Sequence, residues 1–313
     1  MSLISLLIAL LSERYLSNKW WQFNLYYKRY SQFFLKDTVI GSTVMSSVII
    51  LLFLLVPTLL CYFLLAQLDD GLLYLVISTF ILITCFGCSD TRLTYKKYLV
   101  AAFRGESTTC DLIHREFLQN KQLPQMGFGQ ALVWLNYRYF IAVMVFFVLF
   151  GAPGALFYRL LTRLNERCVT INEEENHIEV NTNEVNTNEV NLDVSNEEGD
   201  ETNAININVK QKDVVCFSHH LLFIVDWIPV RIIALGYMLV GHFSKAMPIW
   251  LGNLFDINKP SHEILISVAQ KSEDFMIDTQ DCTAEPCTLV RLAKRTLLLC
   301  LAFISILILT GVL

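Results

Sequence analysis

The chain has 313 residues, of which 54% are hydrophobic and only 17% are charged, and its formal net charge is −5. Soluble globular domains average about 45–50% apolar and about 25% charged residues, so this composition excludes an ordinary soluble domain and indicates a membrane protein. Nine cysteines, mostly in or beside apolar runs, predict buried reduced thiols rather than a disulfide framework. Cys85 and Cys88 have CxxC spacing, but without a second such pair or a histidine cluster they predict no metal site.

The N-terminal membrane region, residues 1–164, begins with a short apolar stretch and a transmembrane hairpin. Residues 1–15 are too short to cross a bilayer, which takes about 20 residues, and they lack the basic region and cleavage site of a signal peptide. We interpret them as a retained helix that dips into the bilayer or packs on other segments. The uncharged runs 39–66 and 72–88 flank the acidic turn QLDDG and predict two crossings.

Basic residues stand on both sides of this hairpin, and its turn contains none. The positive-inside rule therefore places residues 12–38 and 89–138 in the cytoplasm. The segment 89–138 is polar enough to be soluble, and its apolar residues recur at helical spacing. It predicts a cytoplasmic helical segment.

The third apolar run, 139–157, is interrupted by GAPG at 151–154 and followed by Arg159. Glycine and proline release backbone groups that lipid cannot satisfy, and freed N–H groups can bind an anion. The guanidinium of Arg159 would add a planar, permanently charged fork suited to phosphate or carboxylate. The alternative is a kinked helix that ends in a snorkelling arginine, and the sequence leaves both interpretations open.

A fourth run, 221–240, contains Asp226, Pro229 and Arg231. Because Asp or Arg at a helix centre costs about 2.5–3.5 kcal/mol on insertion scales, the run is either a broken membrane helix facing protein or a helix at the interface. Its two charges, five residues apart, mark either a functional site or a structural ion pair. If this run and the third one are re-entrant, residues 89–296 all face the cytoplasm; if both cross, the arginines after Phe157 lie outside, against the charge rule. We favour the re-entrant arrangement.

Residues 165–213 differ in composition from the rest of the chain. They contain NTNEV twice, are rich in Asn and Glu and have almost no aromatic or basic residues, which predicts a disordered, low-complexity insertion. The second membrane-associated half, 214–313, ends in the apolar run 297–313, whose entrance RLAKR is predicted to be cytoplasmic. The predicted fold class is an all-α, polytopic integral membrane protein with a transmembrane hairpin, broken or re-entrant segments, a C-terminal transmembrane helix and a disordered acidic insert.

Charged and polar side chains gather at the predicted cytoplasmic ends of the apolar runs. They form a candidate lining for an anionic ligand, and the alternative is that they are ordinary charges flanking membrane helices. The sequence contains no phosphate loop, HExxH, GxSxG or strand-linked GxGxxG motif, and no basic stripe with interleaved aromatics indicates nucleic acid. The ligand-binding candidates are Glu13, Asp90, Arg92, Asn136, Arg138, Arg159, Asp226 and Arg231.

Two motifs, GAPGALFYR at 151–159 and DWIPVR at 226–231, resemble signatures of the CobD/CbiB family. Those are membrane enzymes of cobalamin assembly that use ATP to join an amino-alcohol phosphate to a corrinoid carboxylate. The stretches ALVWLNYRYFIAVMVFF, GHFSKAMPIW, LTYKKYLVAAFRGE and the opening ERY are similar to the AmpE branch of that superfamily. The resemblance covers most of the chain outside 165–213. It implies a multi-pass protein of the bacterial inner membrane, linked in function to the AmpD amidase and to signalling that governs β-lactamase induction during cell-wall recycling.

The sequence also departs from the ligase branch, which carries a Glu-Asn pair and an Asp before its third apolar run, where this chain has WLNYR at 134–138. The ligase branch has Asn and Asp soon after its Tyr-Arg, where this chain has Thr162 and Asn165. Because ATP-driven ligation needs Mg²⁺, usually held by carboxylates, the resemblance favours a regulatory protein with a muropeptide or nucleotide ligand over an enzyme. The rival hypothesis is an ATP-dependent amide ligase that uses ATP and Mg²⁺, whose metal ligands would have to be Glu13, Asp90 and Glu106.

Overall fold

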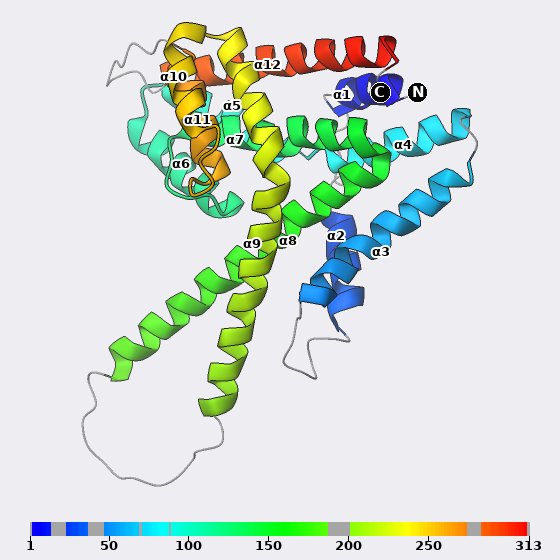
Figure 1. Ribbon diagram of the computed structural model, residues 1–313. Coiled ribbons are helices and arrows are strands. Elements are labelled where there is room, and N and C mark those ends of the chain that lie inside the picture. Colours follow the sequence, from blue (N-terminus) through cyan, green and yellow to red (C-terminus); the bar gives the residue numbers. More distant parts are fainter. Residues whose placement is uncertain are drawn as a thin grey trace, which may run out of the picture.

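The structure, a computed structural model, describes residues 2–13, 23–36, 47–68, 71–87, 89–186, 201–273 and 283–311, without the side chains of 2, 13, 33–36, 47–48, 89, 167–186 and 201–216. The described residues are helical and contain no β-strand, which confirms the predicted all-α class (Figure 1). In chain order the elements are α1 (Ser2–Glu13), α2 (Phe23–Lys36), α3 (Ser47–Ala66), α4 (Leu72–Cys85), α5 (Ser89–Phe103), α6 (Ser107–Lys121), α7 (Phe128–Asn136), η2 (Tyr137–Ile141), α8 (Ala142–Asn186), α9 (Glu201–Val240), α10 (Phe243–Asn253), α11 (Ser261–Lys271) and α12 (Ala284–Leu309).

Several helices are long and apolar enough to cross a bilayer. Large apolar side chains on them face outward, and Leu60, Phe63 and Leu309 are each more than half exposed. Such a surface is unfavourable in water but matches lipid acyl chains, so the predicted polytopic membrane protein is confirmed. Within the described residues the candidate spans are Ile49–Ala66, Phe128–Glu166, Phe217–Val240 and Ala284–Leu309, and α4 with α5, bent by 43°, passes the same test as a pair.

The N-terminal helix α1 packs along α4. The hydroxyls of Ser5 and Ser78 lie 3.2 Å apart, and Leu6 and Ala9 are buried at the contact while Leu11 is exposed. The packing against other helices that the sequence allowed for this segment is therefore observed. At the other end of the chain α12 starts at Ala284, so the membrane helix expected from residue 297 begins about three and a half turns earlier and includes the RLAKR sequence.

The segment Phe128–Glu166 folds back on itself at Gly151. A straight helix of 39 residues would be about 58 Å long, roughly twice the hydrocarbon thickness of a bilayer. At Gly151 the backbone instead takes φ 71° and ψ −162°, a left-handed conformation that glycine adopts easily. The two arms then lie side by side (Figure 1), since the rings of Phe146 and Tyr158 stack at 4.8 Å. The GAPG motif thus forms the tip of a helical hairpin.

The hairpin tip lies beside the start of α4. A side-chain carbon at Gly151 would stand 3.9 Å from the hydroxyl of Tyr74, which is near the α3–α4 turn. The second arm then runs along α4, so that Arg159 reaches Gly87 just beyond the other end of that helix. The charged base of the hairpin and the turn between α3 and α4 therefore lie at opposite ends of α4.

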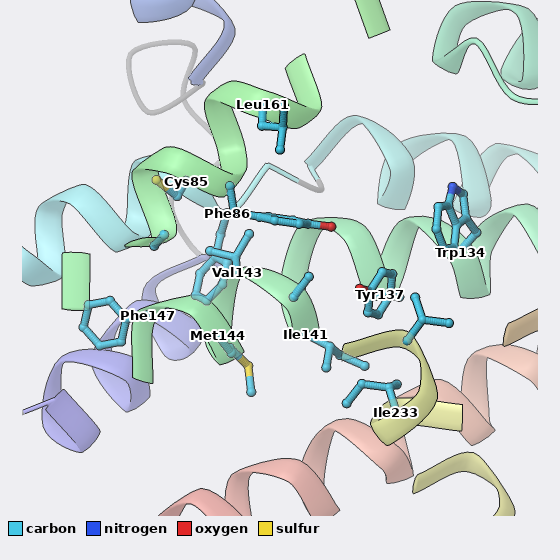
Figure 2. Packing of buried hydrophobic residues seen from close by; sticks show 14 of the residues in the cluster. Cys85, Phe86, Trp134, Tyr137, Ile141, Val143, Met144, Phe147, Leu161 and Ile233 are labelled. Atoms are coloured by element: carbon cyan, nitrogen blue, oxygen red, sulfur yellow. The ribbon is translucent and has the colours of Figure 1, made fainter. Parts of the chain in front are cut away.

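One apolar core joins both halves of the chain. It includes Leu6 of α1, Tyr158 of α8, Ile233 of α9 and Leu289 of α12. Figure 2 shows side chains from α4, α7, η2, α8 and α9 meeting in it, among them Cys85, Tyr137 and Ile233. Cysteines 61, 85, 110, 287 and 300 are free thiols, in agreement with the prediction for that part of the chain.

The acidic insertion differs from its predicted boundaries. Helix α8 continues to Asn186 and α9 begins at Glu201, so the ends of segment 165–213 are helical extensions of membrane helices. Helical hydrogen bonds can propagate from an already formed helix at low cost, a cooperative effect that composition does not reveal. Residues 187–200 lie outside the described residues, and the side chains of Asn165 and Glu166 belong to the packed interior.

Candidate functional site

The candidate site begins at the π-helical turn η2, where the chain from α7 enters α8. A π-turn adds one residue to the helical repeat, and such turns occur frequently at functional sites. Here it leaves three consecutive side chains, Tyr137, Arg138 and Tyr139, all buried. An ordinary helix would direct these three side chains well apart, and at least one of them would normally face outward from a packed surface.

Arg159 is the central side chain of the site. It is 0% exposed, and none of its three nitrogens has a hydrogen-bond acceptor among the described residues. Its guanidinium lies over the rings of Tyr139, at 4.3 Å, and Phe23, at 5.6 Å. Ring faces attract a cation, but they do not replace the hydrogen bonds that a buried charge requires. The guanidinium therefore retains unused donors in a low-dielectric environment.

Two glycines allow Arg159 to occupy this position. The break at Gly151 turns the second arm back toward η2. Gly87, just after α4, lets the guanidinium approach closely, because a Cβ at that position would lie 2.5 Å from Nη2 of Arg159. Any other residue at position 87 would displace the arginine or the chain.

The carboxylate of Glu166, whose side chain is 11% exposed, lies further along the same arm. It pairs with Arg163 at 2.8 Å and lies 3.9 Å from Arg138, and it accepts a hydrogen bond of 3.0 Å from the Tyr139 hydroxyl. Residues 159, 163 and 166 are spaced by four and three, so they share one face of α8. Glu166 is engaged by these partners, and it attracts Arg159 electrostatically without accepting a hydrogen bond from it.

Lys121, the last residue of α6, completes the positive side of the site. Its Nζ lies 5.6 Å from the centre of the Tyr139 ring. Burial, and then the charge of Arg163, lowers the pKa of Lys121 below its ordinary value. Asp90, exposed at the start of α5, attracts both Lys121 and Arg163 from the edge of the site. The site therefore contains four cations and the carboxylate of Glu166, with Asp90 at its edge. We call Lys121, Arg138, Arg159, Arg163 and Glu166 the Arg159 cluster.

Asp226 on α9 connects the cluster to the second half of the chain. It is 2% exposed and accepts hydrogen bonds from Tyr137 at 2.8 Å and Tyr158 at 2.9 Å. It also lies close enough to Arg138 for electrostatic attraction. Arg138 thus stands between two carboxylates, Glu166 on α8 and Asp226 on α9.

Comparison with known proteins assigns the family. The family described as "Regulatory signalling modulator protein AmpE" matches residues 1–183 and 210–313. The chain belongs to the AmpE family. It is also 24% identical over 275 residues to "Protein AmpE" of Shigella flexneri, an alignment that covers 80% of this chain and 81% of that protein. No solved structure matches the chain. The Arg159 cluster and Asp226 all lie within the AmpE-matched ranges, and the unmatched residues 184–209 fall inside the acidic insertion.

Arg231 stands apart from the site in this AmpE-family chain. Its guanidinium donates to the backbone carbonyls of Trp227 at 2.9 Å, Leu254 at 2.6 Å and Asp256 at 2.7 Å. The ion pair with Asp226 that the sequence suggested is therefore replaced by separate partners for each charge. Because Asp226 and Arg231 are five positions apart on a helix, their side chains point about 140° away from each other. Arg231 therefore connects α9 to the loop after α10 by hydrogen bonds instead of facing Arg138.

The remaining sequence candidates lie at different distances from the cluster. Asn136, just before η2, has a buried side-chain oxygen without a partner among the described residues. Arg92 is half-buried on α5, two residues after the peripheral Asp90. The side chain of Glu13 lies outside the described residues.

Three residues of the cluster, Lys121, Arg163 and Glu166, were not among the sequence candidates. Glu166 falls inside the predicted insertion 165–213, and Lys121 inside the predicted cytoplasmic helical segment 89–138. The available signal was the Arg-Arg-Glu spacing on one face after the GAPG break, whereas nothing in the sequence brings α6 to η2.

The Arg159 cluster suits an anion better than Mg²⁺. The described residues contain no group of three or more His, Cys, Asp or Glu side chains placed to hold a metal ion. Glu106, one of the carboxylates required by the ligase hypothesis, is exposed in the α5–α6 turn, and Glu166 is already engaged by two arginines and a tyrosine. Guanidinium groups with free donors instead match phosphate or carboxylate oxygens.

Proposed function

We propose that this protein is a regulator in the bacterial inner membrane that binds the anionic group of a ligand at the Arg159 cluster. The observation that carries the proposal is the fully buried guanidinium of Arg159, which has no acceptor among the described residues. An unpaired buried charge is costly, and ionisable groups inside membrane segments mark functional sites by default. An anionic ligand that accepts hydrogen bonds from Arg159 would remove this cost.

Membership of the AmpE family supports the regulatory part of the proposal. The family resemblance implies a role in β-lactamase induction during cell-wall recycling and a functional link to the AmpD amidase. Muropeptides carry carboxylates and nucleotides carry phosphates, and both groups match the donors of an arginine. A muropeptide is the ligand class that fits this biological context.

Binding at Arg159 also offers a route by which a signal reaches the rest of the molecule. An anion near Arg159 would compete with Glu166 for Arg138 and Arg163, which lie 3.9 Å and 2.8 Å from that carboxylate. Movement of Arg138 would change its attraction to Asp226 on α9. Because Tyr137 and Tyr158 donate hydrogen bonds to Asp226, this change would also alter the packing of α9 on the hairpin. A ligand can shift a conformational equilibrium only through such differences in contact between two states.

The alternative function is an ATP-dependent amide ligase like the CobD/CbiB enzymes. The observation that favours it is the same excess of cations, which suits a triphosphate. Among the described residues, however, no set of carboxylates is placed to hold the Mg²⁺ that this ligase reaction needs.

The test is calorimetry on the purified protein in nanodiscs, with a carboxylate-bearing muropeptide and with Mg-ATP as separate probes. Arg159→Gln removes the charge at the site, and Arg295→Gln is the matched control because Arg295 is about half exposed on α12. We expect muropeptide binding that Arg159→Gln weakens at least tenfold and Arg295→Gln leaves unchanged. Mg-ATP binding with the same dependence would instead support the ligase. Equal affinity of both variants for every probe would refute the anion site.

A further inference from the structure

A groove on the outer face of the α5–α6 hairpin forms a second candidate binding site, away from the Arg159 cluster. It has a volume of about 410 Å³. Its apolar lining includes Leu93 and Val100 of α5, which are 56% and 50% exposed, and Ile113 of α6. Next to it the side chain of Phe103 is 76% exposed. An apolar surface of this kind calls for an apolar occupant.

The edge of the groove is basic. Lys96, Lys97 and Arg104 line it with a single carboxylate, Glu106, and all four side chains are exposed. Positions 93, 96, 97 and 100 recur at helical spacing, so they form one continuous face of α5, and Arg104 follows directly after its last residue. The groove therefore combines an apolar floor with a net charge of +2, the pattern expected for an amphiphile with an anionic head.

The opposite face of α5 is committed to protein packing. Tyr98 is buried and stacks on Phe128 of α7 at 3.9 Å. The Tyr95 hydroxyl contacts the sulfur of Cys287 on α12 at 3.6 Å. Because the inner face is fixed in this way, the groove face is held outward and stays available.

The position of α5 relative to the bilayer places the groove at the membrane surface. Helix α4 has 14 residues and is therefore about 21 Å long, shorter than the hydrocarbon thickness of about 30 Å. The chain after α4, including the first turn of α5, must complete the crossing, and α5 is bent by 43° relative to α4. Leu93 then lies near the acyl boundary, and Lys96, Lys97 and Arg104 lie among the headgroups.

We propose that this groove binds an anionic phospholipid of the leaflet that faces the base of the hairpin. The phosphate sits between Lys96, Lys97 and Arg104, and the upper acyl chain lies on Leu93 and Val100. Basic clusters next to membrane helices attract anionic lipids at about a fivefold gain in affinity per Lys or Arg near the surface. The site is independent of the anion proposed at Arg159, since none of its residues belongs to that cluster.

The experiment is a native mass spectrometry titration of the delipidated, detergent-solubilised full-length protein. The probes are phosphatidylglycerol and phosphatidylcholine with identical chains. We expect wild type to bind the first phosphatidylglycerol at least tenfold more tightly than phosphatidylcholine. The double variant Lys96→Gln/Lys97→Gln should lose about 25-fold in affinity for phosphatidylglycerol and keep its affinity for phosphatidylcholine.

A matched control removes the same charge elsewhere. Arg115→Gln/Lys271→Gln changes two exposed residues that do not line the groove, and we expect it to bind phosphatidylglycerol as wild type does. Val100→Glu adds a negative charge to the floor and should weaken phosphatidylglycerol binding with all three basic residues present. An unchanged lipid preference in Lys96→Gln/Lys97→Gln, or an equal loss in the control, would overturn the proposal. So would tighter binding of a poly-glutamate peptide than of phosphatidylglycerol, which would make the groove a protein-docking surface.

Discussion

Replacing Arg159 with methionine tests whether this arginine is kept for binding or for stability. The side chain is 0% exposed, its nitrogens have no acceptor among the described residues, and methionine fills a similar unbranched volume without charge. The matched variant is Arg163→Met, one turn further along the same helix, because Arg163 pairs with Glu166 at 2.8 Å. We expect the two substitutions to change the free energy of unfolding in opposite directions.

The magnitudes follow from the contacts. Arg159→Met loses two cation–π contacts, each of about 0.5–2 kcal/mol, and removes the desolvation cost of an unpaired buried charge, which is several kcal/mol. The net expectation is a ligand-free protein that is about 1–4 kcal/mol more stable, the range seen when buried ionic groups are replaced by apolar ones. Arg163→Met leaves Glu166 with Tyr139 and a distant Arg138, so we expect a loss of about 3 kcal/mol, the lower end for a broken buried pair.

The assay is thermal unfolding in detergent, followed by reaction of a fluorogenic maleimide with the buried thiols of Cys85 and Cys110. At about 2 °C per kcal/mol, Arg159→Met should raise the midpoint by roughly 2–8 °C and Arg163→Met should lower it by about 6 °C. A decrease for Arg159→Met as large as that for Arg163→Met would show that the arginine is structural. The reasoning behind the anion site would then fail.

Four further predictions concern single contacts. Gly87→Ala should displace the Arg159 guanidinium, cost about 1–3 kcal/mol through overpacking and abolish anion binding in calorimetry, whereas Gly252→Ala, which has open space in α10, should leave binding unchanged. Asp226→Leu should lower stability by about 2–6 kcal/mol in the same melting assay because two buried tyrosine hydroxyls lose their acceptor, and Asp226→Asn, which keeps an oxygen, should lose less. Arg231→Lys should speed limited proteolysis of the loop after α10, since lysine cannot reproduce three carbonyl contacts. Equal cleavage rates in wild type and variant would contradict the idea that Arg231 holds this loop on α9. Burial is the main cause that lowers the pKa of His262 from its ordinary value of 6.5, so the unfolded chain binds the imidazole proton more tightly than the folded one. The free energy of unfolding should therefore fall as the pH drops through 6.5, and His262→Gln should flatten this pH dependence.

Much of the fold could be read from the sequence because membrane insertion depends on local composition. Uncharged runs of sufficient length predict spans regardless of their partners, and the GAPG motif predicts a break wherever lipid surrounds it. The structure agrees, with a span at Ile49–Ala66 and a chain reversal at Gly151. The family could also be read from ordered motifs, which the match over residues 1–183 and 210–313 supports.

What the sequence determined by itself is therefore the class, the spans, the break and the unusual position of Arg159 directly after an apolar run. Only the tertiary structure decided which charges meet. Lys121 reaches the site because α6 ends beside η2, and Glu166 joins it because the hairpin folds back at Gly151. Arg231 leaves it because the helical rotation turns it to backbone carbonyls. Composition sets the solvent that a segment prefers, but pairing between charges depends on distances between helices, which are fixed only when their side chains pack.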